Sequence, residues 1–199
     1  MVSLLPNGIF TALLAYYQNA GLNAELLQND NLETIPGEKS IKIKGGKFDL
    51  VILKFASGTL APQKGLNPDS PKIKNISPTN INFNYIIKGA GNLNEKDLKA
   101  QIKTKTEGFI SKKLLDIKWE GGRIADLLTS DPELKNLIMT WNVVPLKVEP
   151  DAKNNCTCII NEKGVRVFMR SWSDEQTKVE NLPPIETLDV IDRIASYVK

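Results

Sequence analysis

Apolar residues recur at helical spacing near the start of the chain. Between about Pro6 and Ala20 they form one broad face, as expected of a helix that packs against a core. Gly21 and the apolar Leu22 follow, and this pair is typical of a Schellman helix end. The pattern therefore predicts a helix over residues 6–20 and a short strand over 22–27.

The next segment alternates apolar and polar residues with a period of two, which is the pattern of β-strands. Residues 40–44 alternate isoleucine with lysine, Gly45-Gly46 supplies a turn, and residues 48–55 return as a second strand. The returning strand, FDLVILKF, is apolar on both faces, so we expect it to be central in a sheet. Residues 56–78 predict a long surface loop, and residues 80–88 predict another strand.

The middle of the chain predicts helices. We expect a long helix over residues 95–118, capped by Asn92 or Asn94 and bent near Gly108. Two short helices are predicted to follow, over 123–128 and 132–141. The second has Ser130 or Asp131 as its N-cap and Pro132 in its first turn.

The last part of the chain returns to strands. We expect a strand over 146–149 and a hairpin over 156–172, in which residues 161–164 form the turn. A terminal helix begins near Pro184, with apolar residues at positions 188, 191, 195 and 198 facing the sheet.

This order of elements predicts an α+β fold, because the regular strand and helix alternation of a parallel sheet is missing. We expect an antiparallel sheet of roughly five to seven strands, with hairpins over 40–55 and 156–172, packed with N-terminal, central and C-terminal helices. A chain of 199 residues is long enough for one domain over 1–199. The alternative is a division near 89–94 into 1–91 and 92–199.

The composition contains no histidine, and this excludes several chemistries. A Ser-His-Asp triad, a Cys-His pair and any histidine-ligated metal site are impossible within one chain. An enzyme with this sequence must use carboxylates, lysine, tyrosine, cysteine or a cofactor, and no motif for a cofactor is found.

Positive charge is concentrated in the middle of the chain. The net charge of +3 is the sum of −3 for residues 1–37, +9 for residues 38–118 and −3 for residues 119–199. Such a basic segment attracts nucleic acid or another polyanion if its lysines share a face. A solvated lysine-rich surface without a partner is the alternative.

A strand over 165–172 interleaves arginine and aromatic side chains on one face. This arrangement suits stacking on single-stranded bases with neutralisation of phosphates. The structural alternative is that the arginines pair with nearby acids while the aromatic rings pack under a helix. The candidate nucleic-acid-binding residues are Lys42, Lys44, Lys47, Lys99, Lys103, Arg166, Phe168, Arg170 and Trp172.

Three other motifs are incomplete. Gly89-Ala90-Gly91 lacks the third glycine of a dinucleotide-binding turn. Asp49 and Lys54 lack an acid at position 52, which is isoleucine, so they do not complete a magnesium-binding nuclease motif. Cys156 and Cys158 alone do not complete a tetrahedral metal site, so we predict buried apolar thiols and no metal.

No motif covers enough of the chain to assign a family. The leading hypothesis is a non-enzymatic binding or adaptor protein for a protein partner or an apolar small ligand. The alternatives are a nucleic-acid-binding protein that uses residues 38–118, and an enzyme that uses carboxylates or a metal without histidine. The N-terminus lacks the basic region of a signal peptide and no apolar run reaches membrane length, so we expect a cytoplasmic protein without a transmembrane segment.

Overall fold

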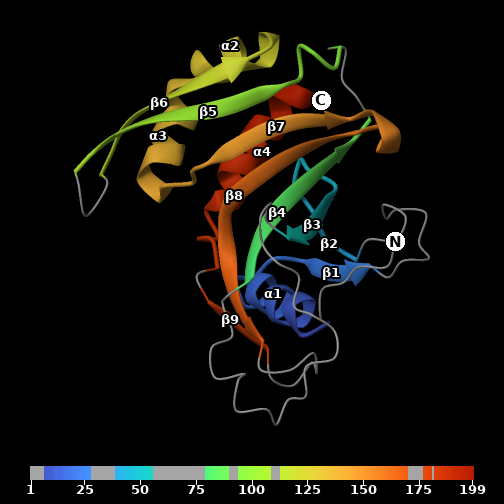
Figure 1. The fold of residues 1–199 in the computed structure, drawn as a ribbon. Helices are drawn as coiled ribbons and strands as arrows, with labels where there is room; N and C mark the ends of the chain where they lie inside the picture. The colour runs from blue at the N-terminus through green and yellow to red at the C-terminus, as the bar shows by residue number, and fades with distance from the viewer. Residues whose placement is uncertain are drawn as a thin grey trace.

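One antiparallel sheet runs through the centre of the molecule (Figure 1). The computed structural model describes residues 7–27, 39–55, 79–89, 94–108, 113–169, 177–180 and 182–199. The strands are β1 (Ala24–Leu27), β2 (Ser40–Ile43), β3 (Leu50–Phe55), β4 (Thr79–Lys88), β5 (Ala100–Glu107), β6 (Lys113–Gly121), β7 (Leu146–Asp151), β8 (Cys156–Met169) and β9 (Thr177–Glu180). The helices are α1 (Asn7–Asn19), α2 (Arg123–Thr129), α3 (Pro132–Trp141) and α4 (Thr187–Val198).

The strand order is β1-β2-β3-β4-β8-β7-β5-β6, and β9 pairs with the far half of β8. Every strand pair among the described residues is antiparallel. The predicted α+β class is therefore confirmed. The sheet has nine strands in the described ranges, more than the five to seven that we expected.

The four helices of the described ranges cover one face of the sheet. The main core lies between them and the strands, and each helix contributes buried side chains to it. The largest of these side chains include Phe10 and Tyr17 of α1 and Tyr85 of β4, which are at most 2% exposed. Because the sheet alternates its side chains between two faces, alternate described residues enter this core: Val51 and Leu53 of β3, Ile81, Phe83, Tyr85 and Ile87 of β4, and Ile159 of β8.

The opposite face carries a smaller apolar cluster. Its buried members are Leu27, Leu50, Ile52, Ile86, Cys156 and Cys158. No described helix contributes to this cluster. The predicted central strand is confirmed, since β3 pairs with β2 and β4 and its residues 50–53 are buried towards both faces.

Two helix ends form as the sequence predicts. After α1, the amide of Gly21 donates to the carbonyl of Gln18 at 2.9 Å and that of Leu22 donates to Tyr17 at 3.0 Å, which is a Schellman motif with Gly21 at φ +82°. At the start of α3, Asp131 accepts hydrogen bonds from the amides of Glu133 and Leu134.

The predicted helix over 95–118 is wrong. Residues 100–107 and 113–121 form the hairpin of β5 and β6, and residues 95–98 form a turn. The apolar residues Ala100 and Ile102, and likewise Ile117 and Trp119, are two positions apart and buried. This period of two favours strands over a helix, because it places the apolar side chains of each strand on one face of the sheet. The β-branched residues Thr104 and Thr106 also favour a strand. Among the described residues 94–108, which follow the predicted Gly89-Ala90-Gly91 motif, there is no helix.

The predicted hairpin over 156–172 is also wrong. Residues 156–169 form one strand, β8, which pairs with β4 along both halves. The turn-like residues 162–164 lie where the register between β4 and β8 shifts, between the pairs Ile81↔Val165 and Phe83↔Asn161. A bulge of this kind lets a strand continue through residues that favour a turn.

The C-terminal helix α4 docks on the sheet as predicted. Val190, Ile191, Ile194, Ala195 and Val198 are buried in the main core. Within the described residues, no helix has the length and apolar character needed to cross a membrane.

The hairpin of β5 and β6 depends on a close backbone approach at Gly122. A Cβ at this position would lie 2.1 Å from the carbonyl oxygen of Lys96. Because that oxygen belongs to the backbone, Gly122→Ala is expected to destabilise the protein by about 3 kcal/mol in urea denaturation. Gly46→Ala, where only the side chains of Phe48 and Asp192 approach, is the matched control and should cost less than about 1 kcal/mol. Equal effects of the two substitutions would contradict the packing of residues 96–99 on Gly122.

Candidate functional site

A charged groove runs along the outer side of α4. It has a volume of about 420 Å³ and is lined by Lys47, Glu133, Leu137, Asp189, Asp192, Arg193, Ser196 and Tyr197. Three elements supply these side chains: the loop between β2 and β3, α3, and α4. Seven of the eight side chains are polar or charged, so the groove suits a polar ligand better than an apolar one.

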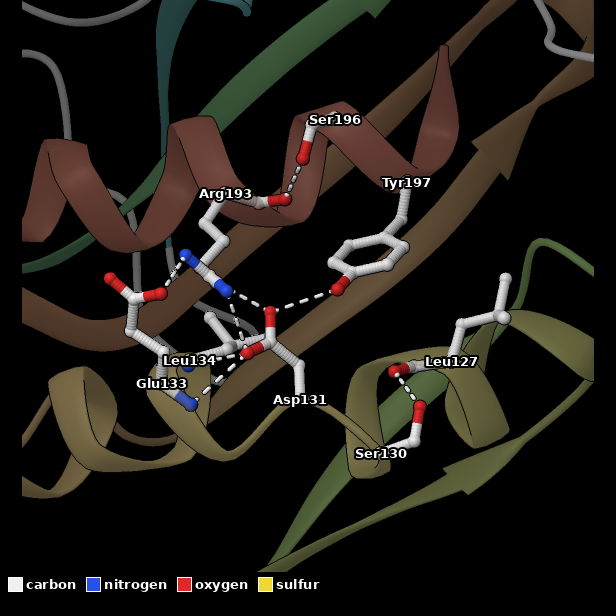
Figure 2. A network of polar contacts seen from close by, with 8 residues as sticks. All are labelled: Leu127, Ser130, Asp131, Glu133, Leu134, Arg193, Ser196 and Tyr197. Carbon is white, nitrogen blue, oxygen red and sulfur yellow. Dashed lines mark hydrogen bonds and ion pairs between the residues drawn. The ribbon is translucent and has the colours of Figure 1, made fainter.

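Asp131 lies beside the groove and joins α3 to α4 (Figure 2). Its side chain is 2% exposed, and its carboxylate accepts from the amides of Glu133 and Leu134 at 3.1 and 3.0 Å. The guanidinium of Arg193 binds both carboxylate oxygens, with Nη2 at 2.9 Å from Oδ1. The hydroxyl of Tyr197 donates to Oδ2 at 2.9 Å.

These five donors explain why a buried charge is tolerated here. The hydrogen bonds from Arg193 are the largest cause that lowers the pKa of Asp131 to about 2, against a burial effect that raises it. Asp131 in turn raises the pKa of Arg193 and of Tyr197. Arg193 also contacts Glu133 through Nη1 at 2.6 Å. The carboxylate of Asp131 is saturated, and it fixes the ends of two helices.

The other groups that line the groove also take part in structural contacts. The carboxylate of Asp192 accepts from the amide of Lys47 at 2.6 Å, and burial raises its pKa. The hydroxyl of Ser196 donates to the carbonyl of Arg193 at 2.6 Å. Among the described residues of this groove, no nucleophile is hydrogen-bonded to a free base.

The candidate lysines divide into two separate groups. Lys42 lies on β2 opposite Glu25, Lys44 forms an ion pair with Glu25 at 3.3 Å, and Lys47 lines the groove. Lys99 directly precedes β5, and Lys103 lies within it. Four strands lie between β2 and β5, so the two strands are five inter-strand spacings of about 4.8 Å apart, roughly 24 Å. The two groups do not form one patch on the sheet.

The second group lies on a two-stranded ribbon. β5 pairs with β7 only at Ala100 and Gln101, so the rest of β5 and β6 extends beyond the neighbouring strands (Figure 1). Lys103 lies directly opposite Lys118 in the register, and Lys105 follows on the same face. All three lysines are exposed. Asp116, opposite Lys105, is bound by Lys135 of α3 at 2.6 Å, and this hydrogen bond is the first cause of its lowered pKa.

The predicted arginine and aromatic strand is placed only in part. Arg166 pairs with Asn80 of β4 on one side and with Glu180 of β9 on the other, and Phe168 pairs with Lys178. Arg170 and Trp172 lie outside the described residues. The prediction that this strand stacks on bases is therefore not tested.

The remaining motifs have structural positions. Asp49 accepts from the amide of Lys88 at 2.7 Å and so links the start of β3 to the end of β4. Cys156 and Cys158 are free thiols, 5% and 7% exposed, as predicted. Burial raises the pKa of both thiols, that of Cys158 to about 12. One donor atom from each thiol and one from Asp151 lie within 4.8 Å of one another, which makes them the metal-binding candidates of the described chain.

Sequence reasoning missed two features of this surface. The link between Asp131 and Arg193 joins residues 62 positions apart, and no local pattern indicates it. Lys118 is not in the candidate set, and the predicted helix over 95–118 does not place it opposite Lys103. Recognising the period of two in residues 100–107 would have found it.

Comparison of the chain with protein-family models, with curated proteins and with solved structures found no significant match.

Asp131→Asn tests the link between α3 and α4. The lowered pKa means that the ionised carboxylate stabilises the fold above about pH 4, and that this contribution is lost as the pH falls towards 2. We expect the variant to be about 2 kcal/mol less stable than the wild type at pH 7 and nearly equal to it near pH 2. Thermal or urea denaturation from pH 7 to pH 2 measures the difference. Asp126→Asn, on the exposed side of α2, is the control. A difference in stability between wild type and Asp131→Asn that does not change with pH would contradict the stabilising role of the ionised Asp131 carboxylate.

Proposed function

We propose that this protein is a non-catalytic binding protein whose partner is a nucleic acid, contacted through the ribbon of β5 and β6. The observation that carries the proposal is the juxtaposition of Lys103, Lys105 and Lys118 on one exposed face of a ribbon that extends from the sheet. The charged groove, whose ionisable groups hold the helices together, supports binding rather than catalysis.

The electrostatics of the ribbon favour an anionic partner. Side chains directly opposite each other in an antiparallel pair are about 5 Å apart at Cβ, and like charges there are destabilising. Lys103 and Lys118 form such a pair. A phosphate between the two ammonium groups converts this repulsion into attraction, and Lys105, about 7 Å along the strand, reaches the next phosphate.

The dimensions of the ribbon suit a nucleic acid groove. A two-stranded ribbon fits the major groove of B-form DNA, which is about 12 Å wide. The ribbon carries lysine without arginine, which supports contact with phosphates rather than readout of bases.

The groove along α4 is charged, so it does not suit an apolar small ligand, and the hypothesis of such a ligand stays a prediction. Binding of a protein partner and a location in the cytoplasm stay predictions that no observation here tests.

The double variant Lys103→Gln/Lys118→Gln tests the proposal. Labelled single- and double-stranded DNA and RNA are titrated with protein between 50 and 200 mM salt. If three lysines contact phosphates, wild-type affinity falls by about 40-fold over this range, because the slope against log salt is about −0.9 per contact. The variant should bind about tenfold more weakly at low salt, with a slope smaller by about 2.

The control Lys42→Gln/Lys44→Gln removes the same charge from the other end of the sheet. It should keep the wild-type slope. An equal loss in both variants would indicate an effect of net charge alone, and absence of salt-dependent binding by the wild type would contradict the proposal. Because the ribbon variant removes a like-charge pair, it should be at least as stable as the wild type, which separates lost binding from lost folding.

A further inference from the structure

Four potential metal ligands form a square on the face of the sheet opposite the helices. Glu149 and Asp151 are two positions apart on β7, and Cys156 and Cys158 are two positions apart on β8. In the register of these strands, Glu149 lies opposite Cys158 and Asp151 lies opposite Cys156. Directly paired residues project to the same face with Cβ atoms about 5 Å apart, so the four side chains are neighbours.

The distances among three of these side chains, Asp151, Cys156 and Cys158, suit a metal ion. A carboxylate oxygen of Asp151 and the two Sγ atoms lie within 4.8 Å of one another. Around a tetrahedral zinc ion, with bonds of about 2.3 Å to sulfur and 2.1 Å to oxygen, donor atoms are roughly 3.4 to 3.8 Å apart. A small rotation of the side chains therefore closes the three donors on one ion.

We propose that Asp151, Cys156 and Cys158 bind Zn²⁺, with the carboxylate of Glu149 as the fourth ligand. Two thiolates and two carboxylates suit a borderline ion such as Zn²⁺ better than Mg²⁺ or Ca²⁺, which prefer oxygen alone. Both thiols bind as thiolates, so each Zn²⁺ that enters releases two protons to solvent.

The surroundings of Asp151 hold its carboxylate in place for this role. Oδ1 accepts from the amide of Asn154 at 3.2 Å, and Oδ2 accepts from Asn154 Nδ2 at 2.8 Å. Each carboxylate oxygen keeps a further lone pair for a metal. The 3₁₀ turn Ala152–Asn154 and Asn155 in the left-handed conformation join the two strands and fix their register. Hydrogen bonds that orient a ligand in this way are typical of metal sites.

Four anionic ligands carry −4, and Zn²⁺ offsets half of this charge. Burial is the largest cause that raises the pKa of Cys156, and the charges of Lys54 and Lys88 act in the opposite direction. The thiols are 5% and 7% exposed, whereas Glu149 and Asp151 are half-buried, so a metal enters from the carboxylate side.

The test uses the full chain, reduced and freed of metal by a chelator. Titration with Zn²⁺ should reach one ion per chain, and the chelator should remove it again. Co²⁺ should give the thiolate-to-metal charge-transfer band and the intense d–d bands of tetrahedral coordination. Since Cys156 and Cys158 are the two cysteines of the chain, the charge-transfer band reports on this site alone.

Single substitutions identify the ligands. Cys156→Ser, Cys158→Ser and Asp151→Asn should each weaken Zn²⁺ binding by more than about 100-fold. Glu149→Gln and Asn154→Ala should each weaken it by about tenfold. The matched control is Thr157→Val, because Thr157 lies between the two cysteines but projects to the helix-covered face; it should bind Zn²⁺ as the wild type does.

Absence of Zn²⁺ binding by the folded wild type would overturn the proposal. So would a Co²⁺ complex without the thiolate band, or wild-type affinity in Asp151→Asn. Circular dichroism checks that each variant is folded. Asp151→Asn and Glu149→Gln keep the test decisive if the buried cysteine variants fail to fold, since these two side chains are half-buried and their replacements are isosteric.

Discussion

The pairing of β4 with β8 is the interaction on which the rest of the structure depends. It runs from Thr79↔Val167 to Lys88↔Cys156, with a shift in register between Ile81 and Phe83. Residues 81–87 of β4 are buried, apart from the half-buried Asn82. One set of their side chains belongs to the main core, to which the described helices also contribute, and Ile86 enters the cluster on the other face. Each neighbouring strand is then added to one side of this pair.

The lysine-bearing ribbon of β5 and β6 and the proposed zinc site both depend on β8. Its first half, from Cys156 to Asn161, pairs with β7, and β7 holds β5 through two residue pairs near Ala100. The ribbon of lysines is therefore anchored at its base and exposed along most of its length, which suits a segment that contacts a partner. The square of Glu149, Asp151, Cys156 and Cys158 is formed directly by the pairing of β7 with β8. Rigid pairing at the centre thus positions both surfaces.

Much of the fold follows from patterns that are local in sequence. Gly21 ends α1, Asp131 begins α3, and the apolar run over 50–53 forms a central strand, because each effect requires only neighbouring residues. The predictions for residues 95–118 and 156–172 were wrong because pairing with a strand distant in sequence determines the structure there. Residues 162–164 resemble a turn until β4 pairs with the strand that contains them, and residues 95–118 contain enough lysine and leucine to suggest a helix until Ile102 and Trp119 meet in the core.

The candidate sites, like the fold, could be predicted from the sequence only where local residues determine them. Sequence reasoning identified Lys103 and the two cysteines, but not what lies opposite them. Lys118 and Asp151 become neighbours only through the registers of two strand pairs. The saturation of Asp131 by Arg193 and Tyr197 likewise requires α3 and α4 to be placed side by side. Chemistry that depends on pairing across strands or helices is visible only once the pairing is known.

Hydrogen exchange of the backbone amides tests most directly whether β4 and β8 organise the molecule. Their amides should be among the slowest to exchange, with a free energy of opening equal to that of global unfolding, and the strands β1–β3 should share that value. The outer ribbon, residues 103–107, should exchange faster because it pairs only with β6. If the amides of β4 and β8 instead open at a lower free energy than their neighbours, the central role of this pair is contradicted.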